Sequence, residues 1–349
     1  MAKFIGYIGS YTFRSASKGI GIYDVDTESG RFTLREEVPE NNAEYLKVSS
    51  DHRFLYAAVD EGISSYRILP DGGLEFLRRS TIRGMRGCHI ALHPGGRYIV
   101  VSGYYDGKMT VMRITEDGIA SEIVAEVFDK GIGSIAERNF APHISCCKFT
   151  RDGRFLCSVD SGIDQVRIYG FNDATGELTL RTILHCEMNS NPCQIMFSPD
   201  GSRLYVLHSL GNYISLYNFS STDRGIPTFE LVENYKTLPP DYNVPSAACN
   251  FTVSPDFLHL FVMNAGENSV ALFDVDPSSG RLTKKRILPV SGEYPKDCKA
   301  FPEGDFFVSI NHDSNTLTFF TLHYDKSLII MNGLPVKCDS PNSLVFAKL

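Results

Sequence analysis

Polar side chains that can transfer protons or bind a ligand recur at two kinds of position in this 349-residue chain. One kind lies at the start of an apolar, strand-like segment, and the other comes directly after such a segment. The first kind comprises His89, His143, Gln194 and Lys296, and the second comprises Asp160, His208, Asn264, Asn311 and His312. Imidazole and carboxyl groups serve general acid–base chemistry, and amide and ammonium groups bind polar ligands. Each residue could instead satisfy backbone groups in a loop, so a site requires a fold that collects them.

Motifs for other chemistries do not occur in the sequence. The nine histidines show no His-x-His or His-Glu-x-x-His spacing, and His93 lies in a turn, where we expect it to face solvent. There is no Gly-x-Ser-x-Gly nucleophile elbow and no Gly-rich phosphate-binding loop. Cys193 lies near the candidate positions, but small buried thiols are common packing residues. We therefore expect no metal ion and no cofactor.

The elements that must position the polar residues are short strands in a repeated unit. One copy, NPCQIMFSPDGSRLYVLHSLGNYISLY (191–217), predicts a strand, a tight turn at Asp200-Gly201, a second strand, a polar corner and a third strand. Similar units recur roughly every 50 residues. They begin at Tyr45, His89, His143, Ala248 and Asp297. A fourth strand follows in most copies, for example GELTLRTIL from Gly176.

Four strands in a repeat of this length are typical of a propeller blade. The C-terminal SPNSLVFAKL resembles the first strand of the unit, and the N-terminal FIGYIGSYTFRSASKGIGIYDVD resembles the second and third strands. The sequence therefore predicts an all-β, seven-bladed β-propeller, one domain spanning residues 1–349, closed by a blade that both termini share. A pair of β-sandwich domains is the alternative, but it explains the split repeat less well.

Composition narrows the possible partners and location. The formal charge is −7 and no long basic run occurs, so we expect no nucleic-acid binding. No apolar run reaches the ~18 residues of a membrane span. Nine scattered cysteines, an odd number without a Cys-x-x-Cys spacing, favour reduced thiols and a cytoplasmic protein.

In a propeller, the two kinds of polar position meet on one face, around a funnel that can hold a ligand. The whole chain also resembles the seven-bladed lactonase family, the propeller-type 6-phosphogluconolactonases. The resemblance rests on the repeated SPDG-R-L-V pattern, on IGSYT followed by KGI, on ERNFAPH (137–143), on VDSGIDQV with Asp160 and Asp164, and on the segment that holds Asn311 and Asp313.

Several positions depart from the pattern of that family. Where relatives carry Pro-Arg-His and then Asn-Glu-Leu, this chain has Pro192-Cys193-Gln194 and then His208-Ser209-Leu210. The second histidine of a Pro-His-x-His segment is replaced by Ser145, and the usual Pro-Arg is replaced by Pro295-Lys296.

Lactone hydrolysis needs an activated water, a stabilised carbonyl oxygen and a bound substrate. We expect His208 to act as the base, His143 and Asp160 to position water or the carbonyl, and Arg138 and Lys296 to bind an anionic substrate. The further candidate substrate-binding residues are His89, Gln194, Asn264, Asn311 and His312.

Three functions follow from these expectations. The first is a 6-phosphogluconolactonase-like hydrolase acting on a sugar lactone that can carry a phosphate. The second is a non-catalytic propeller that binds a carbohydrate or a protein, and the third is a muconate-type lactonising isomerase. The sequence does not determine the oligomeric state.

Overall fold

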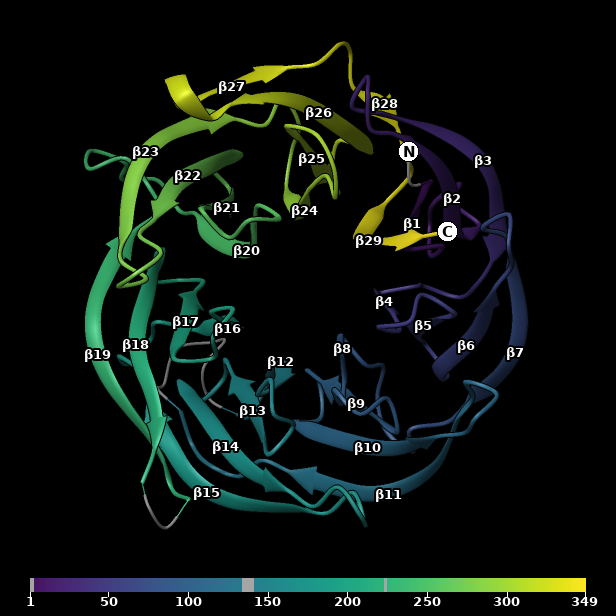
Figure 1. Ribbon diagram of the computed structural model, residues 1–349, viewed down its shortest axis with the longest axis vertical. Helices are drawn as coiled ribbons and strands as arrows, with labels where there is room; N and C mark the ends of the chain where they lie inside the picture. Colours follow the sequence, from purple (N-terminus) through teal and green to yellow (C-terminus); the bar gives the residue numbers. More distant parts are fainter. Residues whose placement is uncertain (1–2, 134–140, 223–224) are drawn as a thin grey trace.

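The structure, a computed structural model, describes residues 3–133, 141–222 and 225–349. These residues form seven antiparallel sheets arranged around a central channel, which confirms the predicted seven-bladed propeller (Figure 1). Six sheets have four strands, and the seventh has five because two short strands, β27 and β28, both pair with β26. No helix in the described part of the chain is long and apolar enough to cross a membrane.

We number the blades from the one that contains the N-terminus and give their strands from the channel outward. Blade 1 comprises β29 (Pro341–Lys348), β1 (Phe4–Ser10), β2 (Gly19–Asp26) and β3 (Arg31–Pro39). Blade 2 comprises β4 (Tyr45–Val48), β5 (Phe54–Val59), β6 (Gly62–Ile68) and β7 (Leu74–Ser80). Blade 3 comprises β8 (His89–Leu92), β9 (Tyr98–Gly103), β10 (Lys108–Ile114) and β11 (Ala120–Phe128).

Blade 4 comprises β12 (Ile144–Phe149), β13 (Phe155–Asp160), β14 (Gln165–Phe171) and β15 (Leu178–His185). Blade 5 comprises β16 (Pro192–Phe197), β17 (Arg203–His208), β18 (Tyr213–Ser221) and β19 (Pro227–Lys236). Blade 6 comprises β20 (Ala247–Val253), β21 (His259–Ala265), β22 (Ser269–Val275) and β23 (Leu282–Pro289). Blade 7 comprises β24 (Pro295–Ala300), β25 (Phe306–Asn311), β26 (Thr316–His323), the short helix η1 (Tyr324–Lys326), β27 (Leu328–Met331) and β28 (Val336–Lys337).

The two ends of the chain share blade 1, as the split repeat predicts. Strand β29 pairs antiparallel with β1, with Val345 opposite Tyr7, and lies next to the channel (Figure 1). Because this pairing joins the last strand to the first, the ring closes without leaving an unpaired sheet edge between the termini.

The core consists of apolar layers between neighbouring blades. Middle strands such as β5 are buried throughout because both of their faces pack against another sheet. Between blades 5 and 6, Leu207 and Ile214 belong to one buried cluster with Val262 and Ala271. The apolar residues between the blades therefore stabilise the ring, and the polar side chains that could bind a ligand lie at strand ends and in loops.

One expectation about a turn residue is wrong. His93 is buried, its Nε2 lies 3.3 Å from the carbonyl oxygen of Gly153, and its ring stacks on Phe171 at 4.9 Å. The turn that contains His93 packs against blade 4, which the sequence of one blade cannot show.

The innermost strands of blades 4 to 7 each contain one extra residue. The pairing with the second strand shifts by one residue at these points, which is the signature of a β-bulge. The extra residues are Ser145, Cys193, Cys249 and Lys296. A bulge re-aims the side chains beside it, so these strands present two consecutive side chains near the channel mouth.

Candidate functional site

Loops that precede the innermost strands and loops that follow the second strands meet on one side of the ring, here called the top face. Glu44 directly precedes β4, Tyr11 lies in the loop between β1 and β2, and Lys296 belongs to β24. These residues come from blades 2, 1 and 7, and their side chains are in direct contact. The predicted convergence of the two kinds of position therefore occurs in this part of the ring.

A carboxylate flanked by two cations forms the first group, the Glu44 cluster (Tyr11, Glu44, Arg86, Lys296 and Asn342). Glu44 Oε1 lies 3.3 Å from Lys296 Nζ, and Oε2 lies 3.7 Å from Arg86 Nη2 and accepts the hydroxyl of Tyr11. Lys296 Nζ also donates to Asn342 Oδ1 at 2.8 Å. The Glu44 side chain is only 13% exposed, so these interactions act at reduced dielectric.

Arg86 connects this cluster to blade 3 and to a second carboxylate. Its Nη1 lies 3.2 Å from Asp60 Oδ1, and its guanidinium carbon is 4.9 Å from the centre of the Tyr11 ring. Burial acts to lower the pKa of Arg86, but Glu44 and the Tyr105 hydroxyl raise it overall. The guanidinium therefore stays charged, held between carboxylates and aromatic rings.

The second group lies at blade 4 and centres on the buried Asp160. Asp160 Oδ1 accepts the backbone N–H groups of His143 at 2.8 Å and Gly162 at 3.0 Å. Burial, together with the charge of the neighbouring Asp129 and a hydrogen bond with it, raises the pKa of Asp160 to about 7. This carboxyl group consequently changes protonation state near neutral pH.

Asp129 is held in place by two residues of β14. Its Oδ1 accepts the hydroxyl of Tyr169 at 2.9 Å and lies 3.1 Å from Arg167 Nη1. Oδ2 of Asp129 and Oδ2 of Asp160 are buried and accept no hydrogen bond from any other described group. We infer that the two carboxyl groups share a proton, which satisfies both oxygens.

The ring of His143 has a defined orientation above this pair. Its Nδ1 lies 2.7 Å from the carbonyl oxygen of Tyr104, and the two rings stack at 4.5 Å with an interplanar angle of 12°. Since a carbonyl oxygen only accepts hydrogen bonds, Nδ1 is the donor in this contact and carries a proton.

Aromatic rings join the two groups into one arc across the top face. Tyr104 contacts Tyr105 with ring centroids 5.5 Å apart, and the Arg86 guanidinium carbon lies 5.9 Å from the Tyr105 ring. The arc therefore runs from His143 through these rings and Arg86 to Lys296. It places an imidazole ring, a carboxylate and two cations on one face.

His208, the predicted base, does not belong to this arc. It is buried within blade 5, where Nδ1 lies 3.0 Å from Ser190 Oγ, Nε2 lies 3.0 Å from Ser215 Oγ, and the ring stacks on Tyr213. Burial lowers the pKa of His208 to about 3. Both ring nitrogens are occupied and protonation is disfavoured, so this geometry argues against a role in proton transfer.

Two predicted substrate-binding residues are also buried and hydrogen-bonded to other residues of the protein. Asn264 Nδ2 donates to the carbonyl oxygen of Thr237 at 3.2 Å, and Asn311 Nδ2 donates to Thr318 Oγ1 at 2.9 Å. Asp160, His208 and Asn311 end the second strand of their blades, and Asn264 is the last residue but one of β21. Each of these side chains is hydrogen-bonded within the protein, and Asp160 is the one that carries a carboxyl group.

The remaining predicted residues lie in different places. His312 borders the Glu44 cluster, with its ring 5.6 Å from that of Tyr11. Gln194 is half-buried on β16 beside the bulge, and His89 is buried deeper in the channel, in ring contact with Tyr45. Arg138 lies outside the described residues.

Three of the bulged residues, together with Cys88 directly before β8, link neighbouring blades through hydrogen bonds to backbone carbonyl groups. The donor–acceptor pairs are Cys88 Sγ to Ile144 O (3.3 Å), Ser145 Oγ to Cys193 O (3.0 Å), Cys193 Sγ to Ala248 O (3.5 Å) and Cys249 Sγ to Pro295 O (2.7 Å). Burial raises the pKa of Cys193 well above its usual value. A thiol in this state is a weak nucleophile, which agrees with a packing role.

Sequence reasoning missed Tyr11, Glu44, Arg86 and Asp129. One signal was available for Glu44. Tyr45 pairs with Ala58, and Asp297 pairs with Ile310, at the same position of blades 2 and 7. Aligning these two residues puts Glu44 in register with Lys296. The two residues then lie at the same level of blades 2 and 7, which flank blade 1.

Comparison with known proteins agrees with this architecture. The ring of seven antiparallel sheets, closed by a strand from each end of the chain, defines a seven-bladed β-propeller. The profile of the family described as "Lactonase, 7-bladed beta-propeller" matches residues 5–346. The chain belongs to this family.

Individual relatives match over nearly the whole chain. The 6-phosphogluconolactonase of Bacillus subtilis is 28% identical, with 92% of this chain and 91% of that protein covered. A solved protein from Lactobacillus plantarum is 26% identical with a TM-score of 0.89, and 99% of each chain is covered. The periplasmic gluconolactonase of Pseudomonas aeruginosa has the same fold, with a TM-score of 0.91, 23% identity and 99% coverage of both chains.

Proposed function

We propose that this protein is a lactonase that hydrolyses the ring ester of a sugar lactone on the top face. Family membership and the B. subtilis relative support the reaction class. The observation that carries the proposal is the arc from His143 to Lys296, which holds an imidazole ring and two cations on one face.

Each group has a task in the proposed reaction. His143 Nε2 accepts a proton from water, and the water oxygen forms a bond to the lactone carbonyl carbon. Lys296 and Arg86 stabilise the negative charge that develops on the carbonyl oxygen. The bond between that carbon and the ring oxygen then breaks, the ring oxygen takes up the proton from His143, and a sugar acid leaves.

Glu44 and Asp160 are positioning residues in this scheme. Glu44 holds Lys296, Arg86 and Tyr11 together, and Asp160 fixes the backbone of His143. Because these contacts are made before any substrate binds, little reorganisation is needed in the reaction.

We propose a phosphorylated sugar lactone as the substrate, since the B. subtilis relative is a 6-phosphogluconolactonase, and hence a role in the pentose phosphate pathway. All nine cysteines are unpaired thiols, which supports a cytoplasmic location. Cell fractionation tests the location, and sedimentation of the purified protein tests the oligomeric state.

The decisive assay is hydrolysis of 6-phosphogluconolactone and of unphosphorylated lactones, corrected for spontaneous hydrolysis. We expect His143→Asn and Lys296→Met to lower kcat/KM by about 100-fold or more. Lys337→Met, which removes an exposed lysine on blade 7, serves as the matched control and should retain full activity. Saturable sugar binding without turnover of any lactone would refute the proposal in favour of a binding propeller, and formation of a lactone from a dicarboxylate would favour the isomerase.

A further inference from the structure

Three blades place a lysine at the same position of the channel wall. Lys47, Lys148 and Lys299 lie opposite Tyr56, Cys157 and Val308 in their respective sheets. Each lies two residues beyond the level of Tyr45, Cys146 and Asp297, and therefore ~6–7 Å deeper in the channel. The same position in blades 3, 5 and 6 is occupied by Ala91, Met196 and Thr252.

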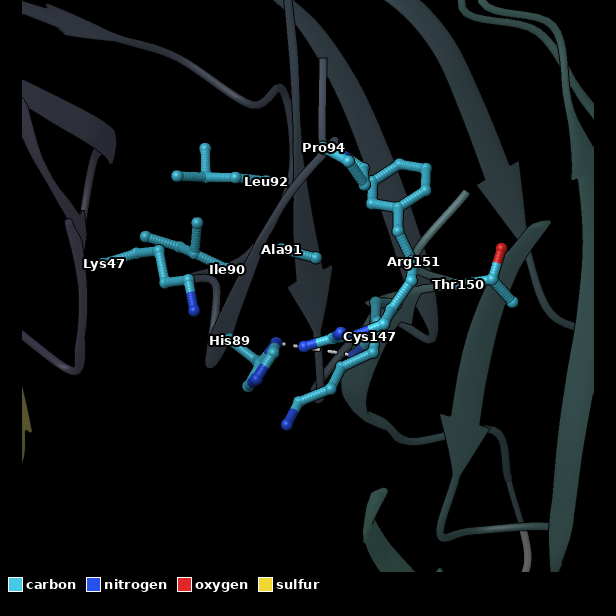
Figure 2. A pocket seen from close by; sticks show the side chains of 11 residues that line it. Lys47, His89, Ile90, Ala91, Leu92, Pro94, Cys147, Thr150 and Arg151 are labelled. Atoms are coloured by element: carbon cyan, nitrogen blue, oxygen red, sulfur yellow. Dashed lines mark hydrogen bonds between the residues drawn. The ribbon is translucent and has the colours of Figure 1, made fainter. Parts of the chain in front are cut away.

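A cavity of about 460 Å³ opens between blades 2, 3 and 4 at this level. Its charged lining residues are Lys47, Lys148 and Arg151, and no aspartate or glutamate from the described ranges lines it. Figure 2 shows Lys47 on one side of the cavity, Arg151 on the other and His89 between them. Pro94, Thr150 and Arg151 follow the innermost strands, so the cavity opens away from the top face.

The positive charge of this region is only partly compensated. Lys299 Nζ lies 3.1 Å from Asp297 Oδ1, and Asp297 also accepts Asn250 Nδ2 at 2.7 Å. Lys47 and Lys148 form no ion pair with any residue that the structure describes. Two ammonium groups therefore face the same cavity without a counter-charge.

The lysine pKa values reflect this crowding. Burial, followed by repulsion from Lys148 and Lys299, lowers the pKa of Lys47 to about 8. Burial also lowers the pKa of Lys148. His89 is neutral here because burial and the nearby lysines lower its pKa well below the usual value. A bound anion would reverse the shift at Lys47 by favouring its charged form.

We propose that this cavity is a binding site for a phosphate-type oxyanion, held by Lys47, Lys148 and Arg151. A phosphate group has several oxygens that can accept hydrogen bonds from two ammonium groups and a guanidinium at once. The cavity is larger than phosphate alone, so a phosphate ester of a small metabolite also fits. The site is separate from the arc on the top face and does not depend on the proposed lactonase activity.

Thermal unfolding and calorimetry of the full chain with inorganic phosphate test the proposal. At about ten times its Kd, phosphate should raise the Tm of the wild type by about 2–4 °C, in a buffer without other oxyanions. Affinity should fall as the pH rises through about 8, where Lys47 loses its charge.

The variant to compare is Lys47→Met/Lys148→Met. Met196 already occupies the equivalent position of blade 5, so the fold accommodates this side chain. Without phosphate the double variant should have a Tm at least equal to that of the wild type, because two repelling charges are gone. With phosphate it should show no increase, whereas the Lys337→Met control should respond like the wild type.

Comparison of 6-phosphogluconate with gluconate separates a phosphate ester from the sugar acid as the source of binding. We expect the phosphorylated compound to raise the Tm and gluconate not to. An equal phosphate response in the wild type and the double variant would overturn the proposal, as would the absence of a response in the wild type at 50-fold higher phosphate. If the double variant fails to fold, Lys47→Met alone must lower phosphate affinity at least about 10-fold.

Discussion

The buried Asp160 predicts a pH dependence of stability that one substitution should abolish. A carboxyl group with a pKa of about 7 in the folded protein and the usual 3.8 when unfolded binds more protons in the folded state between these values. Stability therefore falls as the pH rises from about 4 to about 7. The full shift corresponds to about 4 kcal/mol, and sharing the proton with Asp129 reduces this to roughly 2–4 kcal/mol.

Asp160→Asn removes this titration while keeping the local hydrogen bonds. The amide oxygen can still accept the N–H groups of His143 and Gly162, and the amide nitrogen can donate to Asp129. We expect the variant to match the wild type near pH 4 and to exceed it by roughly 2–4 kcal/mol at pH 8. Urea unfolding at pH 4, 6 and 8 measures the difference.

Asp200→Asn provides a control with the opposite sign. Hydrogen bonds from Ser198 and Ser202 lower the pKa of this carboxyl group to about 2, so its contribution is present at neutral pH and disappears as the pH falls from about 4 to 2. Asp200→Asn should be less stable than the wild type at pH 6 and approach it at pH 2. Stability curves of the wild type and Asp160→Asn that run parallel from pH 4 to 8 would refute the account of the buried pair.

Three further substitutions separate structural from catalytic roles. His208→Ala should lower the free energy of unfolding by about 2–4 kcal/mol, because it leaves a cavity and two serine hydroxyls without their partner. It should change kcat by less than about 3-fold. A 100-fold loss of activity in folded protein would restore His208 as the base. Arg86→Lys should lower lactonase kcat/KM about 10-fold or more, since an ammonium group does not span Glu44 and Asp60 as the guanidinium does; unchanged kinetics would exclude Arg86 from the site. Tyr205→Phe should lower the free energy of unfolding by about 1 kcal/mol, measured in urea, because its hydroxyl donates to a backbone carbonyl of the next blade at 2.8 Å, and an unchanged value would contradict this.

The fold can be predicted from the sequence because each blade repeats the same pattern of strands and turns. Apolar strands, a turn such as Asp200-Gly201 and the split unit at the termini all specify one arrangement, and the structure agrees. The candidate site is harder to predict from the sequence, because its contacts join blades that are far apart in the chain. Lys296 and Glu44 are 252 residues apart, and nothing local to either residue indicates the ion pair.

Histidine shows why residue type alone misleads. His143 and His208 both occupy predicted site positions, but one begins an innermost strand and the other ends a second strand. His208 is buried within blade 5, where burial favours a neutral ring and both nitrogens lie near serine hydroxyls. His143 directly precedes β12 at the channel mouth, on the top face, where its ring stacks on Tyr104. Separating these cases requires the depth of each position within the ring.

The bulges explain how one repeated strand can serve packing and polar chemistry together. Without a bulge, consecutive side chains on the innermost strand alternate between faces, and a polar residue at the mouth would fix its neighbour in an apolar layer. The extra residue interrupts this alternation at the top end only, as the shifted pairing around Lys296 shows. Below the bulge the regular register resumes and places Lys299 at the level of Lys47 and Lys148. The same strand thus contributes Lys296 to the arc on the top face and holds Lys299, paired with Asp297, at the level of the lysines that line the cationic cavity.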